Sequence, residues 1–201
     1  MAKINLDDMN QEYFDVLREI GNIGTGNATT ALSQMLNCKV DMNVPQVKLL
    51  EFSHVGELMG GEELIMAGIY LGVQGDIKGS ILFLLEKESA QKLVERLLGT
   101  PSSGDELSEM EQSALKEIGN IITASYLNSL STLTNLVIYP SVPSLSVDMA
   151  GAILSVPAIV FGTIADKLLL IQTQFFDGLN GYFILAPDLD SYDKILSSLG
   201  M

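Results

Sequence analysis

The sequence lacks tryptophan and has a single cysteine and a single histidine among its 201 residues. A lone Cys38 excludes an intrachain disulfide and fits a reducing compartment, and we expect it to be buried beside a helix end. A lone His54 excludes a His-rich metal site and a Ser–His–Asp triad present twice. The sequence therefore predicts no metal and no cofactor bound by this chain.

Long hydrophobic runs and an excess of positive charge are also missing. The longest apolar candidate, residues 153–161, is interrupted by Ser155 and Pro157 and is shorter than the roughly 18 residues of a membrane span. The N-terminus has no apolar run of the signal-peptide type, so we expect a cytoplasmic protein. The net charge of −14 argues against nucleic acid and acidic membranes as partners, because both bind basic surfaces. It suits a protein partner with a basic patch.

What the sequence does contain is an internal duplication. When the sequence is shifted by 98 positions, residues 16–23 align with residues 114–121, and the register continues to Pro45 and Pro143. Further along, residues 79–85 resemble 181–186, and each segment precedes a short helical pattern that ends at a glycine. We therefore expect one domain, residues 1–201, made of two repeats at about 7–99 and 106–200.

Each repeat is predicted to form a long helix, an extended segment, a strand pair and a short helix. The second long helix should begin at Ser108, a good N-cap with Glu111 three residues on. In the first repeat the expected elements are a helix at 7–36, extended chain at 39–52, strands at 64–73 and 76–85, and a helix at 89–98. In the second they are a helix at 108–133, strands at 136–147, 158–174 and 181–185, and a helix at 191–199.

The interleaved helices and strands predict a layered α/β (α+β) fold with pseudo-twofold symmetry. Because the halves repeat, we expect the two long helices to pack on one shared, mixed or antiparallel sheet rather than on two separate ones.

Both long helices carry a polar stripe with the spacing i, i+4, i+7. At 3.6 residues per turn these positions lie within roughly 60° of one another. A single Glu-x-x-Asn is typical of a solvated helix face, but two copies in register favour a function, since neighbouring polar positions differ between the repeats. The stripes are Asp15, Glu19 and Asn22 in the first helix and Ser113, Glu117 and Asn120 in the second.

Glycines inside the helices allow two interpretations. Gly21 and Gly119 are retained in both repeats, although glycine in a helix costs about 1 kcal/mol relative to alanine. Either a partner approaches the backbone there, or the glycines permit close helix packing. The run at 21–27 is not a nucleotide-binding fingerprint, because it lies in a helical pattern and no Walker lysine follows.

A carboxylate beside a carboxamide limits the possible chemistry. The amide of asparagine does not ionise, but it offers one acceptor and two donors in a fixed plane and can hold a water molecule. Phosphoryl transfer can be catalysed in this way, because it depends mainly on positioning and charge neutralisation. The missing metal ion and cationic group would then come from a substrate protein.

The repeated pattern Asp/Ser-x3-Glu-x2-Asn-x22-Pro resembles the signature of the CheC family of chemotaxis phosphatases, and the resemblance covers the whole chain. It implies a substrate, the two-component response regulator CheY carrying an aspartyl phosphate and Mg²⁺. It also implies that Asn22 and Asn120 orient the attacking water and that Glu19 and Glu117 contact a lysine of CheY. The implied supporting residues are Asp15, Ser113, Pro45 and Pro143.

The resemblance implies a second partner, the receptor deamidase CheD. Residues 146–152 are similar to the region that the family uses for CheD, which makes Asp148 a candidate contact, although Asp148 could equally cap a helix. Two other functions stay open. One is a non-catalytic module that binds a regulator, as in flagellar switch proteins. The other is a sensor of a small ligand, which no cluster of polar residues in the sequence supports.

Overall fold

The computed structural model describes residues 11–41, 46–102, 104, 106–161, 167–174 and 180–200. Seven antiparallel strands form one sheet in the order β1-β6-β7-β3-β2-β4, and β5 pairs with β2 beside β4. The strands are β1 (Gln46–Glu51), β2 (Ile65–Gly75), β3 (Gly79–Glu86), β4 (Ile138–Pro140), β5 (Ser144–Met149), β6 (Lys167–Gln174) and β7 (Asn180–Pro187). The helices are α1 (Gln11–Leu36), α2 (Phe52–Leu58), α3 (Lys87–Leu98), α4 (Glu109–Thr134), α5 (Ala150–Phe161) and α6 (Leu189–Ser198).

The two repeats share this sheet by exchanging strands. At its centre β3 pairs with its duplicate β7, while β1 pairs with β6 and β5, the duplicate of β1, pairs with β2. Gln46 and Ser144, the first residues of β1 and β5, lie 98 positions apart, whereas Gly79 and Gly181 lie 102 apart. The duplication and the shared antiparallel sheet are thus confirmed, and the second repeat is four residues longer than the first between these strands.

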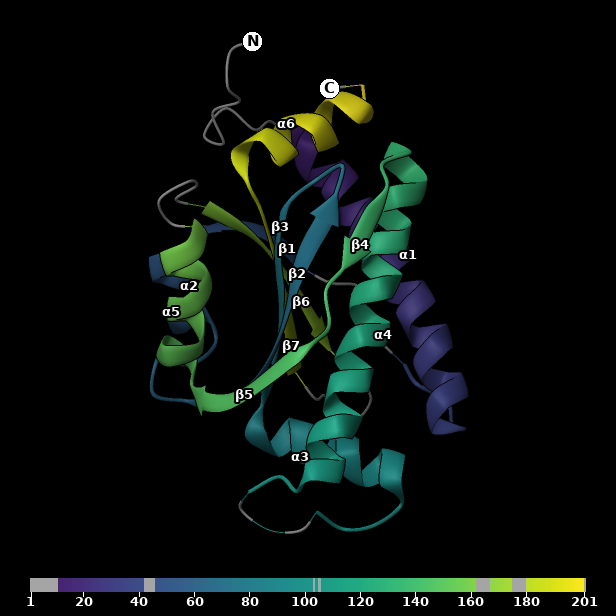
Figure 1. Cartoon of the computed structure of the whole chain (residues 1–201), viewed down its shortest axis with the longest axis vertical. Helices are drawn as coiled ribbons and strands as arrows, with labels where there is room; N and C mark the ends of the chain where they lie inside the picture. The colour runs from purple at the N-terminus through teal and green to yellow at the C-terminus, as the bar shows by residue number, and fades with distance from the viewer. Residues whose placement is uncertain are drawn as a thin grey trace.

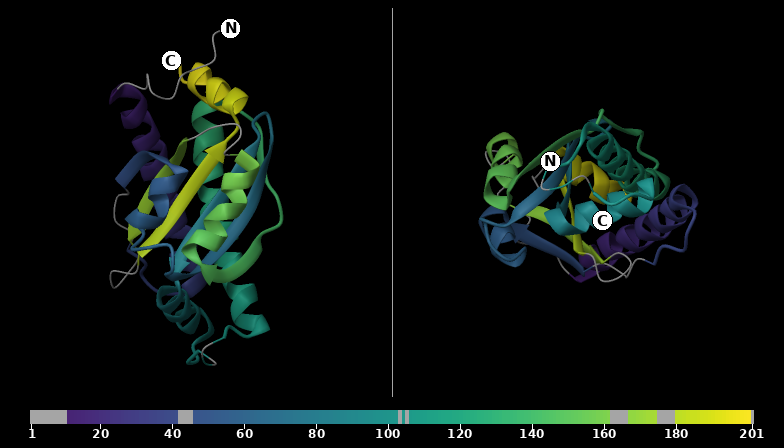
Figure 2. Two further views of the ribbon diagram at one scale, coloured as in Figure 1. Left: turned by 90° about the vertical axis from the view of Figure 1, so that its left-hand side faces the viewer. Right: turned by 90° about the horizontal axis from the view of Figure 1, so that it is seen from below.

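Helices cover both faces of the sheet (Figures 1 and 2). The antiparallel pair α1 and α4 lies on one face, α2 and α5 lie on the other, and α3 and α6 lie at opposite ends. The alternation of side chains along a strand explains the two interfaces. Ile81 and Phe83 of β3 point into the α1–α4 side, and Leu82 and Leu84 into the α2–α5 side.

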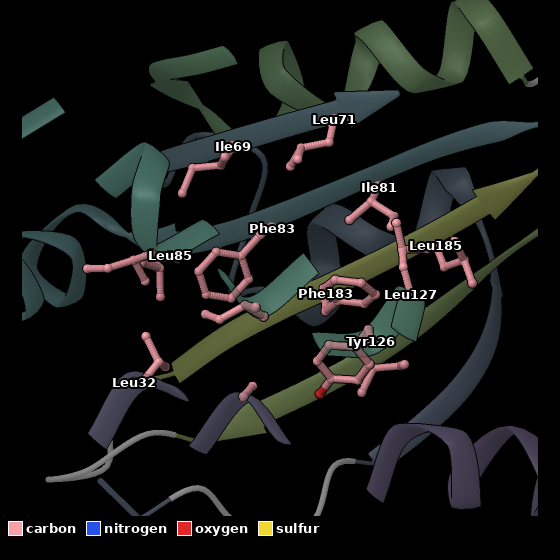
Figure 3. Close-up of a cluster of buried hydrophobic side chains, with 14 of the residues drawn as sticks. Leu32, Ile69, Leu71, Ile81, Phe83, Leu85, Tyr126, Leu127, Phe183 and Leu185 are labelled. Atoms are coloured by element: carbon pink, nitrogen blue, oxygen red, sulfur yellow. The ribbon is translucent and has the colours of Figure 1, made fainter. Parts of the chain in front are cut away.

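The larger core lies between the sheet and the two long helices (Figure 3). Phe83 and Phe183 pair across the β3–β7 centre, and the ring of Tyr126 stacks on Phe183 with centroids 4.3 Å apart. Leu32 of α1 and Leu115 of α4 are fully buried in the same cluster. Burial of each such side chain contributes about 1.5–3 kcal/mol, so this core fixes both long helices on the sheet.

The predicted start of the second long helix is confirmed. Ser108 caps α4, its hydroxyl accepts a hydrogen bond from the Glu111 amide, and the Glu111 carboxylate accepts one from the Ser108 amide at 2.7 Å. Ser102 also donates to Glu111 at 2.7 Å, which explains why this glutamate is buried. The cap therefore ties the connection between the repeats to α4.

Several predictions about individual helices and strands, and the prediction for Cys38, are wrong. Residues 158–161 belong to helix α5 and not to a strand, because the apolar segment continues through Pro157 as a helix. The single strand expected at 136–147 is split into β4 and β5, and α2 was not predicted. Cys38 is exposed and not buried; it follows Asn37, which ends α1 in a left-handed conformation, and the chain returns to the core only at Val40. Within the described ranges no helix is long and apolar enough to cross a membrane.

Candidate functional site

The two polar stripes lie toward opposite ends of the long helix pair. Each stripe occupies the first half of its helix, and α1 and α4 run in opposite directions (Figure 1). In both stripes the glutamate, Glu19 or Glu117, is exposed, and the asparagine, Asn22 or Asn120, is half-buried. The helix periodicity thus brings each carboxylate and carboxamide onto one accessible face, as predicted. The two faces do not combine into a single site.

The first stripe contains an ion pair and an unsatisfied amide oxygen. Asp15 accepts a hydrogen bond from the guanidinium of Arg18, with Nη1 and Oδ1 3.2 Å apart. The Oδ1 atom of Asn22 is buried and has no hydrogen-bond partner within the described structure. A buried acceptor without a donor is costly and uncommon. As placed, this oxygen is turned away from solvent, so a group arriving on a partner would reach it only after the Asn22 carboxamide rotates.

The second stripe lines a surface hollow of about 560 Å³. Ser113, Glu117 and Asn120 of α4 form one wall, and Pro143 closes it from the segment between β4 and β5. The remaining lining is mostly apolar and comes from the ends of α1 and α3, the start of α4 and the same segment. These residues are Met35, Leu97, Leu98, Met110, Ala114 and Val142, together with Lys116.

Two of the apolar lining residues are open to solvent, Val142 at 88% and Met110 at 69%. Exposed apolar residues around polar ones are typical of protein-binding surfaces. Met110 therefore belongs to the surface and not to the core. The duplicate position of Met110 is Glu12, so an apolar side chain at this point of the rim belongs to the second repeat alone, whereas Val142 has the apolar duplicate Val44.

Two glycines of the long helices, Gly24 and Gly119, serve packing inside the protein. A Cβ atom at Gly119 would lie 2.7 Å from Cγ2 of the buried Ile69 on β2, and one at Gly24 would lie 2.6 Å from the Tyr126 ring. The packing interpretation is thus confirmed for Gly119. The glycine-rich run at 21–27 lies inside α1, so no phosphate-binding loop forms there.

The crossing of α1 and α4 carries side-chain hydrogen bonds that differ between the two repeats, one of them from Nδ2 of Asn27 to Oγ of Ser129 at 3.2 Å. The hydroxyls of Thr25 and Tyr126 are hydrogen-bonded at 2.7 Å and buried. Thr123 is the duplicate of Thr25. The duplicate of Tyr126 is Ala28, which has no hydroxyl to pair with Thr123. As a result Oγ1 of Thr123 is buried without a partner within the described structure. The two helices that hold the stripes are therefore locked together asymmetrically.

The remaining predicted residues have separate locations. Pro45 lies outside the described residues. Asp148 is exposed on β5, and its Oδ1 accepts a hydrogen bond from the Met149 amide at 2.8 Å. It lines another hollow, of about 290 Å³, between β2, β5 and α5, together with Tyr70 and Ser146. Because α5 begins at Ala150, Asp148 does not directly precede the helix.

Sequence reasoning missed Lys116, Met110 and Val142 as parts of the second site. A signal was available for Lys116, since a cation precedes the glutamate in both repeats, as Arg18 and Lys116. For Val142 there was only its position next to Pro143. No group of three or more His, Cys, Asp or Glu side chains is placed to hold a metal ion among the residues that the structure covers.

Comparisons with known proteins match this architecture. A model of the CheC-like family matches residues 14–49 and 110–147, the two segments that contain the stripes. The CheY-P phosphatase CheC of Bacillus subtilis (strain 168) is 38% identical over 198 residues, which cover 94% of this chain and 95% of that protein.

Solved structures share the fold at lower identity. Thermotoga maritima FliY matches with a TM-score of 0.76 at 22% identity, covering 96% of this chain and 98% of that one. A CheX from Borrelia burgdorferi, solved in complex with CheY, BeF3 and Mg²⁺, matches with a TM-score of 0.54 at 19% identity, over 83% and 96% of the two chains. With a relative this similar over nearly its whole length, the chain belongs to the CheC-like family.

Proposed function

We propose that this protein is a hydrolase that removes the phosphoryl group from the aspartyl phosphate of the chemotaxis response regulator CheY. The observation that carries the proposal is the pair of Glu–Asn stripes on accessible helix faces. The relative named CheY-P phosphatase CheC, at 38% identity, supports the choice of substrate.

In the proposed mechanism, Asn22 or Asn120 holds a water molecule in line with the phosphorus atom. The water oxygen forms a bond to phosphorus while the bond between phosphorus and the aspartyl oxygen breaks. The electron pair of that bond stays on the aspartate carboxylate, and both protons of the water leave on the released phosphate. Because an amide does not titrate, its contribution is positioning, for which a displacement of about 1 Å can cost roughly a hundredfold in rate.

The rest of the charge neutralisation is assigned to the regulator. Mg²⁺ would be held there and would compensate charge on the phosphoryl oxygens. Glu19 and Glu117 are both exposed, and neither belongs to a group of acidic side chains that could hold a metal among the residues that the structure covers. We assign them to a lysine of CheY, an ion pair that would fix the docking geometry.

The alternative is a binding module that recruits a regulator without hydrolysis. The fold does not decide between them, because functions differ within one fold. The asparagines favour catalysis. A binding surface has no need of a carboxamide at the same position of both stripes.

We also propose CheD as a second partner, bound at the hollow that contains Asp148. Its exposed carboxylate and the exposed apolar Val147 and Met149 on the same strand give this edge of the sheet a mixed polar and apolar surface. Asp148→Ala should weaken CheD binding measured by calorimetry and leave dephosphorylation in the absence of CheD unchanged. Equal affinity of CheD for both proteins would contradict this assignment.

The catalytic assignment is tested with Asn22→Ala combined with Asn120→Ala. We expect phosphate release from phosphorylated CheY to fall at least roughly a hundredfold, while the affinity for CheY changes little. Asn128→Ala is the matched control, because Asn128 is exposed on α4 outside the stripe. Wild-type activity of the double variant would rule out the assignment, and tight binding of CheY without any hydrolysis by the wild type would favour the binding module.

A further inference from the structure

A cation stands directly before the glutamate of each stripe, and the two cations have different surroundings. In α1, Arg18 is held by Asp15, three residues earlier, at 3.2 Å. In α4 the residue three positions before Lys116 is Ser113, whose hydroxyl carries no charge. The duplication has therefore kept both cations but only one neutralising carboxylate.

Lys116 is placed within the second site. Its side chain is half-buried and lines the hollow together with Glu117 and Asn120. None of the ion pairs formed by the described residues involves it. A lysine can pack its methylene stem against apolar neighbours and keep its ammonium group in solvent. Leu97, Leu98 and Met110 provide such neighbours around this hollow.

Because the whole chain is strongly acidic, a single cation at a binding surface can change how an anionic partner docks. The protein has 25 acidic and 11 basic residues, so its average field repels an anionic surface. A phosphorylated aspartate is anionic, and so are carboxylates that hold a metal ion beside it. A cation at the contact supplies local attraction, which acts mainly on docking.

We infer that Lys116 is a docking residue of the second site, whose ammonium group meets the anionic groups around the aspartyl phosphate of the regulator. At the first site we expect Arg18 to contribute less, because the carboxylate of Asp15 at 3.2 Å offsets part of its charge. This inference rests on the proposed function. It predicts that the two sites bind the same substrate with different dependence on salt.

The test isolates the second site with Asn22→Ala and adds Lys116→Met, which keeps the stem and removes the charge. With CheY phosphorylated by a small phosphodonor, we expect KM to rise about tenfold, kcat to stay within about twofold, and the increase of KM with salt to become shallower. Lys116→Arg should restore the wild-type KM. Lys92→Met, which removes an exposed lysine of α3 outside the hollow, should change nothing.

Exchanging the neighbours of the two cations gives an independent check. Ser113→Asp copies the first site and should raise the KM of the second site, whereas Asp15→Ser in an Asn120→Ala background should lower the KM of the first. Circular dichroism and thermal unfolding would show whether each variant is folded.

An unchanged KM and salt dependence in folded Lys116→Met would overturn the inference, as would an equal effect of Lys92→Met. A fall in kcat at constant KM would also overturn it, because the lysine would then act on the reacting group. These outcomes are separate from failure of the proposed function, which would appear as full activity of the double asparagine variant.

Discussion

The helices α1 and α4 derive from one duplicated sequence, and their comparison separates what the stripe requires from what each helix does alone. Both keep the glutamate and the asparagine at the same spacing. They differ in the residue that begins the stripe, Asp15 or Ser113, and at the crossing, where Ala28 stands in the place of Tyr126. The shared residues are those to which we assign chemistry, and the differing ones set the charge and packing around it.

The largest expected effect concerns the glycines of the two helices. Gly119→Ala places a methyl group 2.7 Å from the buried Ile69, so we expect it to destabilise the protein by about 2 kcal/mol even after the gain in helix propensity. Gly26→Ala copies Ala124 of the second repeat at an exposed position with nothing within 4 Å, and should stabilise by about 0.5–1 kcal/mol. Urea unfolding measures both, and equal effects would refute the packing role of Gly119.

A smaller effect, on the binding of CheY, is expected at the exposed apolar rim of the hollow beside Asn120. Val142→Asp introduces a charge at an 88% exposed apolar position, so it should leave stability unchanged. In an Asn22→Ala background it should weaken binding of phosphorylated CheY about tenfold, whereas in an Asn120→Ala background it should have little effect. Equal losses at both sites, measured by calorimetry, would show that the rim does not belong to the second site.

The smallest expected effect compares the duplicated threonines at the helix crossing. Thr25→Val removes the buried hydrogen bond to Tyr126 and should cost about 1 kcal/mol. Thr123→Val removes a hydroxyl that has no partner and should be neutral or stabilising by up to about 1 kcal/mol. Opposite shifts in the midpoint of urea unfolding are expected. A loss of stability for Thr123→Val would mean that its hydroxyl is satisfied in solution.

Features that depend on local sequence could be predicted. The N-cap at Ser108 is set by residues within one helical turn, and the stripes follow from the helical period alone. The shared sheet could be predicted because the duplication implies that equivalent strands meet. By contrast, α5 is apolar on all sides and contains Pro157, so neither periodicity nor the proline indicated a helix.

The hollow at the second site could not be predicted, because four segments distant in sequence form it. Met35, Leu98 and Val142 meet there only after α1, α3 and the β4–β5 segment pack around α4. The ion pair of Arg18 was readable from the spacing of three residues, but its meaning came from the contrast with Lys116 in the hollow. The helical periodicity of the sequence predicts which polar residues share a face, but only the tertiary packing determines which residues surround them.

The most direct measurement is single-turnover phosphate release from CheY-P bound at saturation to the wild type, to Asn22→Ala, to Asn120→Ala and to the double variant. If each amide positions water at its own site, each single variant keeps part of the rate, the two rates add up to that of the wild type, and the double variant releases almost nothing. A saturated double variant that releases phosphate as fast as the wild type would contradict water positioning by these asparagines.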